Sequence, residues 1–327
     1  MSKNVIRLTL YALLFALCSS AEAQQPAKVP RVAYFSAGSA SSQASRLEVF
    51  KQGLRDLGYA EGKEIVIEQR YADGKLDRVD ALATELVRLN LASIVTGGPA
   101  ATRAAKKATT TIPIVMGFDY DPVASGVITS LARPGGNITG LSSVAPEISG
   151  KQLELLKEVL PRLSRVAVLV DSTEPGIEQL RKEAELVAAG LKVQLQYQYI
   201  LSPKDIGTAF EAATKGRAQA VLALSSFIII SQRTQIAELA TKNRLPAIYP
   251  WPEFVEDGGL MTYGANSNDL FRRAATYVDK ILKGAKPAEL QVEQPKKFEF
   301  IINLKAAKQI GLTIPPNVLA RADKVIR

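Results

Sequence analysis

The order of apolar segments repeats along this chain, and this repeat restricts the fold more than any other feature of the sequence. Short apolar runs alternate with longer segments whose apolar residues recur at helical spacing, in the order β-α-β-α-β followed by one more helix and strand. In the first half the expected strands are 31–35, 65–72, 92–98 and 112–117, and the expected helices are 45–59, 78–90 and 100–109. In the second half the same order returns, with strands at 165–171, 192–200, 220–226 and 246–250 and helices at 174–191, 202–218 and 231–244.

Alternating strands and helices form parallel sheets with right-handed crossovers and helices on both faces. The repeat therefore predicts an α/β fold of two doubly wound parallel-sheet lobes, and a length of 327 residues suits two domains. Two stretches rich in Pro and Gly, 132–150 and 249–268, predict crossings between the lobes that form a hinge, although ordinary surface loops are the alternative. We expect a first lobe at 24–140, joined by 262–300, and a second lobe at 141–261, joined by 301–327.

The N-terminal segment has the features of a secretory signal peptide. Lys3 and Arg7 precede the uncharged stretch 8–21, and Ala21-Glu22-Ala23 is a small-x-small cleavage signal. The uncharged stretch is shorter than the roughly 20 residues that span a bilayer. We therefore expect removal of residues 1–23 by a cut after Ala23 and a periplasmic location for the mature chain. Cys18 is the only cysteine, so the mature chain would contain no disulfide.

Composition excludes several kinds of chemistry. The chain has no histidine, which rules out Ser-His-Asp and Cys-His nucleophilic sites and a His-ligated zinc. No catalytic set, metal site or cofactor motif can be assembled from the other residues. The two glycine motifs that bind nucleotide phosphates, G-x-x-x-x-G-K-S/T and G-x-G-x-x-G, are absent from the sequence. The formal net charge is +9, but Lys and Arg are scattered without a basic stripe, which favours a solvated surface over a nucleic-acid interface.

Residues that follow the strands are the candidates for a binding site, because ligands of open parallel sheets bind beyond the carboxyl ends of the strands. The two lobes should bring two such sets face to face. The candidates are small hydroxyl residues, glycines, an acid and aromatic residues: Ser36, Thr96, Gly97, Gly98, Phe118 and Asp119 in the first lobe, and Ser172, Ser225, Ser226, Tyr249 and Trp251 in the second.

Several of these candidates also have a structural explanation. The glycines at 97–98 open a helix whose backbone N–H groups attract a carboxylate, or they make a tight turn. Tyr249 and Trp251 lie beside prolines and form a rigid wall for a ligand, or they pack the junction between the lobes. Asp119 accepts a hydrogen bond from a ligand, or it caps the following turn. The four apolar residues at 227–230 line a pocket or belong to the core.

The segment 246–327, from PAIYPWPEF to LARADKVIR, resembles the C-terminal region of a large bacterial family. This family comprises the ABC-transporter substrate-binding proteins of the type I periplasmic binding protein fold, in the branch that includes tryptophan and tyrosine binders. The segments LEVFKQGLRDLGYAEGKEIVIEQRYADG, PIVMGFDYDPVASG and SLARPGGNITGLSS are similar to it as well. The resemblance implies a monomeric periplasmic receptor without enzymatic activity or cofactor, which closes on a small molecule and delivers it to an inner-membrane ABC permease driven by a separate ATPase.

The resemblance also implies which residues line the cleft and where this chain departs from its relatives. The implied cleft residues are Ser36, Thr96, Phe118, Asp119, Ser172, Ser225 and Tyr249. Where many relatives have an aspartate and a proline, this chain has Ser225-Ser226, and it has Trp251-Pro252 where many have a further aromatic residue or an arginine. We expect the ligand to be an aromatic or branched amino acid or a related carboxylate. The alternatives are a ligand-sensing module for a membrane receptor and a two-lobed enzyme that uses carboxylates.

Overall fold

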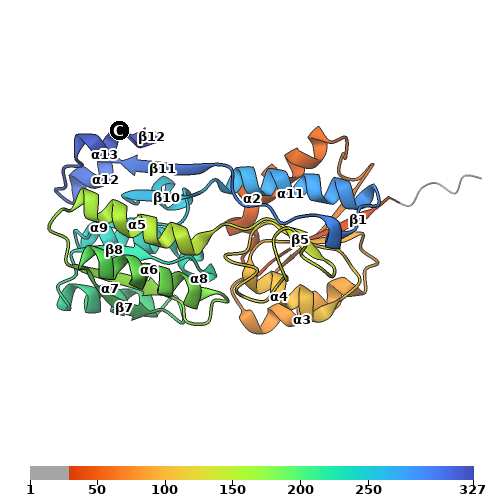
Figure 1. Ribbon diagram of the computed structural model, residues 1–327, viewed down its shortest axis with the longest axis horizontal. Coiled ribbons are helices and arrows are strands. Elements are labelled where there is room, and N and C mark those ends of the chain that lie inside the picture. Colours follow the sequence, from red (N-terminus) through yellow and green to blue (C-terminus); the bar gives the residue numbers. More distant parts are fainter. Residues whose placement is uncertain (1–28) are drawn as a thin grey trace, which may run out of the picture.

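Two separate β-sheets organise the chain into two lobes that lie side by side along the long axis of the molecule (Figure 1). The computed structural model describes residues 29–327. The predicted signal peptide at 1–23 and its cleavage site therefore lie outside the described residues. Within the described part of the chain, no helix combines the length and the apolar character needed to cross a membrane.

The first sheet is parallel throughout and has the strand order β2-β1-β3-β4-β5. Its strands are β1 (Arg31–Ser36), β2 (Val66–Tyr71), β3 (Ser93–Thr96), β4 (Ile114–Met116) and β5 (Ile138–Gly140). The helices α3 (Leu76–Val87) and α4 (Pro99–Ala108) pack against each other on one side of it, and α2 (Ala40–Asp56) packs with α11 (Ser267–Leu282) on the other (Figure 1). The predicted order of strands and helices in this half is confirmed, and β5 is an additional strand within a segment expected to be a loop.

The second sheet has the order β12-β11-β10-β9-β8-β6-β7. Its strands are β6 (Arg165–Val170), β7 (Gln194–Tyr199), β8 (Ala220–Ala223), β9 (Ala247–Tyr249), β10 (Met261–Ala265), β11 (Phe298–Asn303) and β12 (Lys324–Ile326). Its helices are α5 (Ala145–Val159), α6 (Ile177–Leu191), α7 (Asp205–Lys215), α8 (Phe227–Ser231), α9 (Arg233–Lys242), α10 (Glu253–Glu256), α12 (Leu304–Gln309) and α13 (Pro316–Leu319), and a 3-10 turn η1 lies at Pro287–Glu289. Among the described strands, only β10 and β11 pair antiparallel.

The two sheets share one connectivity. In the first sheet the order is second, first, third, fourth and fifth strand, and β7-β6-β8-β9-β10 repeats that order in the second sheet. Successive strands are added on one side of β1 and then, from β3 on, on its other side, and the same change occurs between β6 and β8. Such switch points are where open α/β sheets bind ligands. The predicted α/β fold of two doubly wound lobes is confirmed, and the topology places one switch point in each lobe.

Helix α2 begins five residues earlier than its apolar spacing predicts. The Ser39 hydroxyl accepts a hydrogen bond from the Ser42 backbone N–H at 3.2 Å, and the Ser42 hydroxyl in turn accepts from the Ser39 N–H at 3.1 Å. This reciprocal pair forms a capping box with serine in the third helical position, where glutamate or glutamine is more usual. The early start matters for function because it brings the first turns of α2 to the carboxyl edge of the first sheet.

Three connections join the lobes. The chain leaves the first sheet after β5, returns at Asn266 to form α11 against α2, and leaves again before β11. The connections lie close together, since Leu141 bridges Glu293 and the Asn266 N–H donates to the Lys297 carbonyl at 3.0 Å. The segments 132–150 and 249–268 thus each contain a crossing and also regular structure, whereas the lobe boundaries expected from the sequence stay a prediction.

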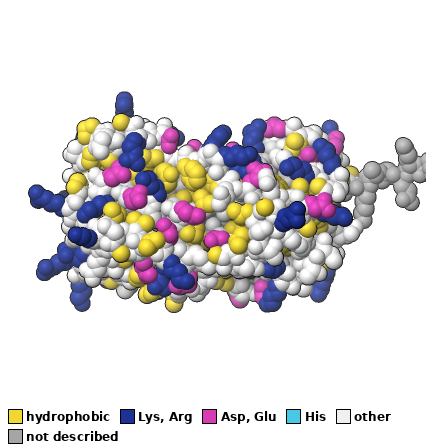
Figure 2. Space-filling view, in the orientation of Figure 1, with side chains coloured by type: hydrophobic (Ala, Val, Ile, Leu, Met, Phe, Trp, Pro, Cys, Tyr) yellow, Lys and Arg dark blue, Asp and Glu magenta, His cyan; other side chains and the backbone are white. Residues whose placement is uncertain are grey.

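Figure 2 shows Lys and Arg side chains spread over the visible face of both lobes and interspersed with acidic side chains. Many surface charges of the described chain are paired, as in the contacts of Arg55 with Glu48 and of Lys107 with Asp80 at 2.6 Å each. On this face the net positive charge is therefore dispersed rather than gathered into a stripe.

Candidate functional site

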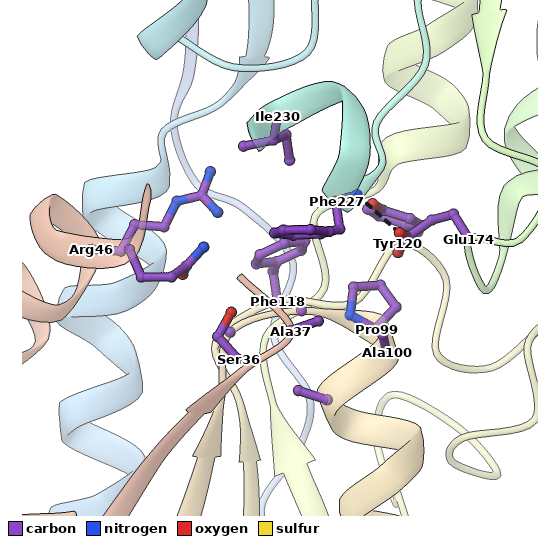
Figure 3. A pocket seen from close by; sticks show the side chains of 14 residues that line it. Ser36, Ala37, Arg46, Pro99, Ala100, Phe118, Tyr120, Glu174, Phe227 and Ile230 are labelled. Carbon is purple, nitrogen blue, oxygen red and sulfur yellow. Dashed lines mark hydrogen bonds between the residues drawn. The ribbon is translucent and has the colours of Figure 1, made fainter. Parts of the chain in front are cut away.

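A narrow cavity lies between the lobes at the carboxyl ends of the strands (Figure 3). Its free volume of about 30 Å³ holds about two water molecules, so the lobes lie close together in this structure. Its wall is formed by both lobes, with Ser36, Ala37, Gln43, Arg46, Gly97, Gly98, Pro99, Ala100, Ala101, Phe118 and Tyr120 from the first and Glu174, Phe227 and Ile230 from the second.

The floor of the cavity is the switch point of the first sheet. Ser36 ends β1, and its hydroxyl accepts a hydrogen bond from the Gly38 backbone N–H at 3.0 Å. Gly98 precedes α4 with φ at +143°, a conformation that side chains rarely adopt, and the Phe118 ring lies 3.2 Å from the place of a Cβ atom there. The first turn of α4 lines the cavity, and although Pro99 has no N–H, the backbone N–H groups of Ala100 and Ala101 favour an anion there.

Arg46 carries the positive charge at one end of the cavity. Its side chain is only 2% exposed, and its guanidinium carbon lies 4.8 Å from the centre of the Trp251 ring and 5.6 Å from that of Phe118. Its Nη2 donates to Glu253 Oε1 at 3.3 Å, while Nε has no partner among the described residues. Stacking uses the faces of the guanidinium and leaves in-plane N–H donors for a ligand.

Acidic side chains gather at the opposite end. Glu174 is 6% exposed, and its Oε2 accepts from the Phe227 backbone N–H at 3.0 Å. Burial raises the pKa of Glu174 to about 8, against the stabilising effect of that N–H on the carboxylate. Burial also raises the pKa of Asp119 to about 6, although Arg103 Nη1 lies 3.3 Å from Asp119 Oδ2. For both carboxyl groups, the nearby positive charge and N–H donors are too weak to offset the effect of burial on the pKa.

Aromatic rings form the middle of the cavity. Phe118 follows β4 and lies 6.0 Å from Tyr120, measured between ring centres. Phe227 begins the short helix α8, whose N-terminus is capped by the Ser226 hydroxyl at 3.2 Å from the Ile229 N–H. Figure 3 shows the Phe227 ring close to Phe118, between Arg46 on one side and Tyr120 with Glu174 on the other.

The candidates predicted from the sequence fall into three groups. Ser36, Gly97, Gly98 and Phe118 line the cavity. Thr96, Asp119, Ser225, Ser226, Tyr249 and Trp251 are buried behind it, and Ser172 is exposed. The predicted positions at the strand ends are thus brought together, but fewer than half of them face the cavity itself.

The buried aromatic candidates pack within the protein. Trp251 Nε1 donates to Ser225 Oγ at 3.0 Å, and both residues line a separate, smaller cavity. Tyr249 is fully buried and stacks on Phe254 with 4.6 Å between ring centres. The aromatic surface towards the main cavity is instead formed by Phe118, Tyr120 and Phe227.

Sequence reasoning missed the polar and charged residues that line the site. Gln43 and Arg46 lie in the first turns of α2, and Glu174 lies two residues beyond Ser172 in the loop before α6. The candidates predicted from the sequence directly follow strands, whereas Gln43 and Arg46 lie on the helix after β1, seven or more residues beyond its end. A capping signal at Ser39 is the sequence feature that points to the start of α2, whereas Glu174 lies in the polar loop 171–176 and has no distinguishing sequence signal. Within residues 29–327 no group of three potential metal-ligating His, Cys, Asp or Glu residues occurs.

The two lobes, their repeated topology and the cavity at facing switch points define a binding protein of the type I periplasmic fold. The family model for ABC transporter substrate binding proteins matches residues 36–326, and the chain belongs to that family. Relatives of this family bind small molecules and work with ABC transporters.

Proteins with known sequences and structures resemble most of the chain. A tyrosine-binding protein of Clostridioides difficile is 24% identical over 263 residues, which covers 80% of this chain and 75% of that protein. The crystal structure of a conserved domain protein from Vibrio cholerae is similar with a TM-score of 0.86 and 29% identity, covering 91% of this chain and 100% of the other. A Streptococcus pneumonia ABC domain in complex with L-Trp has a TM-score of 0.85 and 24% identity, covering 91% and 99%.

Proposed function

We propose that this protein is the periplasmic receptor of an ABC importer and binds a small carboxylate with an apolar body, such as an aromatic or branched amino acid, between its lobes. The lobes close around the ligand, and the closed form delivers it to an inner-membrane permease driven by a separate ATPase. The receptor acts as a monomer and does not convert its ligand chemically. The tyrosine-binding relative and the L-Trp complex support this ligand class.

One observation carries the proposal: the cavity between the lobes is lined by both of them and contains a buried guanidinium. A carboxylate that enters beside Arg46 gains donors from that side chain and from the first turn of α4. An aromatic or branched body then contacts Phe118 in one lobe and Phe227 in the other. Because these contacts come from both lobes, the ligand favours the closed arrangement over the open one.

A thermal-shift screen of the mature chain, Gln24–Arg327, tests the proposal. The protein is first unfolded and refolded to remove any ligand from the expression host, and is then tested with amino acids, aromatic acids, sugars and nucleosides. A ligand at about 100 times its dissociation constant adds roughly 2.7 kcal/mol to the free energy of unfolding, which raises the melting temperature by a few degrees. We expect the shift with aromatic or branched carboxylates; a shift with sugars or nucleosides alone would contradict the proposed ligand class.

A matched pair of variants shows whether a shift arises in the cavity. Phe227→Ala removes a ring from the cavity wall, whereas Phe298→Ala removes a ring that is 40% exposed and stacks on Tyr263. We expect the ligand-induced shift to be lost in the first variant and kept in the second. Equal shifts in both variants would place the ligand elsewhere.

A further inference from the structure

The cavity has a cationic pole and an acidic pole, and the cationic one is Arg46. This guanidinium is buried against the rings of Phe118, Trp251 and Phe271, with the last ring centre at 5.8 Å. Its one salt bridge within the described chain, to Glu253 at 3.3 Å, is long for a charge-assisted hydrogen bond. Several of its five donors are therefore left for an anion in the cavity.

The acidic pole is a group of buried carboxyl groups around Tyr120. Burial raises the pKa of Glu174 to about 8, so this carboxyl gives up its proton when a cation binds beside it. Glu174, Asp119 and Asp171 are all buried and act electrostatically on the Tyr120 hydroxyl, and burial with the charge of Glu174 holds the pKa of Tyr120 well above its usual range. Arg103 is the cation that acts on Glu174 and Asp119. Asp171 is occupied by the Thr173 N–H and hydroxyl at 2.9 and 2.6 Å, and Asp119 Oδ1 has no partner in the described part of the chain. A second positive charge is what this group of acids lacks.

The rings of Phe118 and Phe227 separate the two poles. Figure 3 shows Arg46 on one side of these rings and Glu174 with Tyr120 on the other. A ligand that satisfies both poles must extend across the rings. A common α-amino acid carries its carboxylate and ammonium groups on one carbon, so these two groups cannot reach both poles at once. If its carboxylate binds Arg46, only its side chain can extend to the acidic pole.

We propose that the ligand carries a carboxylate and a positively charged group at opposite ends of a flat apolar body, with Arg46 binding the carboxylate and Glu174 the cation. This inference rests on the proposed function, because it assigns the ligand class of the same cavity. The apolar body lies along Phe118 and Phe227, and the first turn of α4 assists Arg46.

A set of small probes tests the charge arrangement on the unmodified mature chain. Calorimetric titration compares phenylacetate, benzylamine, para-aminomethyl phenylacetate, para-hydroxyphenylacetate and L-phenylalanine. The aminomethyl compound carries both charges at opposite ends of the ring, and L-phenylalanine carries both on one carbon. We expect the aminomethyl compound to bind about tenfold more tightly than phenylacetate and than L-phenylalanine, the factor expected for one additional charged hydrogen bond.

Variants assign each pole to its residue. Glu174→Gln should weaken the aminomethyl compound by about tenfold and leave phenylacetate nearly unchanged, because only the cation contacts this pole. Arg46→Gln should weaken phenylacetate and the aminomethyl compound alike. The matched controls, Glu211→Gln on α7 and Arg88→Gln at the end of α3, replace exposed residues far from the cavity and should alter neither affinity.

The outcomes separate the inference from the proposed function. If L-phenylalanine binds most tightly, or if phenylacetate and its aminomethyl derivative bind equally, the two-pole ligand is wrong and the receptor function stands. Tight binding of para-hydroxyphenylacetate without binding of para-aminomethyl phenylacetate also overturns the inference. The acidic pole would then bind an uncharged hydrogen-bond donor rather than a cation. If none of the probes binds while a sugar or nucleoside does, both the inference and the proposed ligand class fail.

Discussion

Two tyrosine side chains, Tyr249 and Tyr277, differ in whether the hydroxyl has a hydrogen-bond partner. The Tyr277 hydroxyl donates to the Gln291 carbonyl at 2.7 Å, whereas the Tyr249 hydroxyl is buried and has no partner among the described residues. Burial raises the pKa of both side chains above their usual range. A buried polar group without a hydrogen bond destabilises the fold, so these two residues should respond differently to loss of the hydroxyl.

We predict that Tyr249→Phe stabilises the protein by about 1 kcal/mol and leaves ligand affinity unchanged, because it removes an unsatisfied hydroxyl away from the main cavity. The control, Tyr277→Phe, removes a formed hydrogen bond and should destabilise by about 1 kcal/mol. Chemical denaturation measures both changes. A loss of stability in Tyr249→Phe equal to that in the control would mean that the Tyr249 hydroxyl is hydrogen-bonded.

The raised pKa of Glu174 predicts how the stability of the protein depends on pH. Its pKa rises from 4.5 to about 8 on folding, so between these values the folded state binds a proton more tightly than the unfolded state. The stability contributed by the protonated carboxyl is present below pH 4.5 and is lost as the pH rises through 8. Asp171, Tyr120 and Arg103 act on the same carboxyl, and Asp119 acts on Tyr120 beside it.

We predict that the free energy of unfolding of the unliganded protein falls as the pH rises from 4.5 to 8. In Glu174→Gln this decrease should be smaller by roughly a few kcal/mol. Denaturation at a series of pH values measures it, with Glu211→Gln as the exposed control. Parallel pH profiles for the wild type and Glu174→Gln would refute the prediction, because Asp119 would then account for the whole slope.

At the level of elements, strands and long helices could be predicted from the sequence because their apolar period is strong. The runs at 165–171 and 220–226 appear as β6 and β8 within a few residues. Two short elements were not predicted, β5 with three residues and α8 with five. The strands β4 and β9 are as short as β5 but lie in apolar runs, whereas the β5 sequence Ile-Thr-Gly lies in a stretch rich in Pro and Gly. These short elements carry much of the site, since α8 presents Phe227. The charged residues of the cavity lie near the start of a helix, for Arg46, and in a loop, for Glu174. The spacing of apolar residues does not determine where helices start or how loops are placed.

The approach of α8 to the first lobe depends on a glycine. Gly74 has φ at +78°, and a Cβ atom there would lie 2.8 Å from Phe227 Cε1. Phe227 therefore lies directly on the backbone of the loop between β2 and α3, in a contact that joins the two lobes. A side chain at residue 74 would keep the lobes apart at this point.

We predict that Gly74→Ala weakens ligand binding by about tenfold or more, because closure is hindered. Gly62→Ala is a close control, since Gly62 has φ at +85° but nothing within 4 Å of the added methyl. Both variants should lose about 1 kcal/mol of stability from the strained backbone, and only the first should lose affinity. Equal affinity in the two variants would show that the contact of Phe227 with Gly74 is not needed for closure.

At the scale of the whole molecule, the sequence repeat predicts two similar lobes, and the shared strand order confirms it. The crossings between lobes were harder to predict, because their segments also form β5, α10 and β10. Arg46 in the first lobe pairs with Glu253 in the second, so the charges of the cavity also join the lobes. Ligand binding and closure are therefore expected to be one event.

Closure is tested most directly by measuring the distance between the lobes. The predicted mature chain has no cysteine, so two exposed positions, Asp77 on α3 and Lys204 before α7, can be changed to cysteine and spin-labelled. Pulsed electron resonance then gives the distribution of distances with and without the tightest-binding carboxylate probe. The account predicts a broad distribution without ligand and a single narrow one with ligand. The same distribution in both samples, at a ligand concentration that saturates binding, would contradict closure around the ligand.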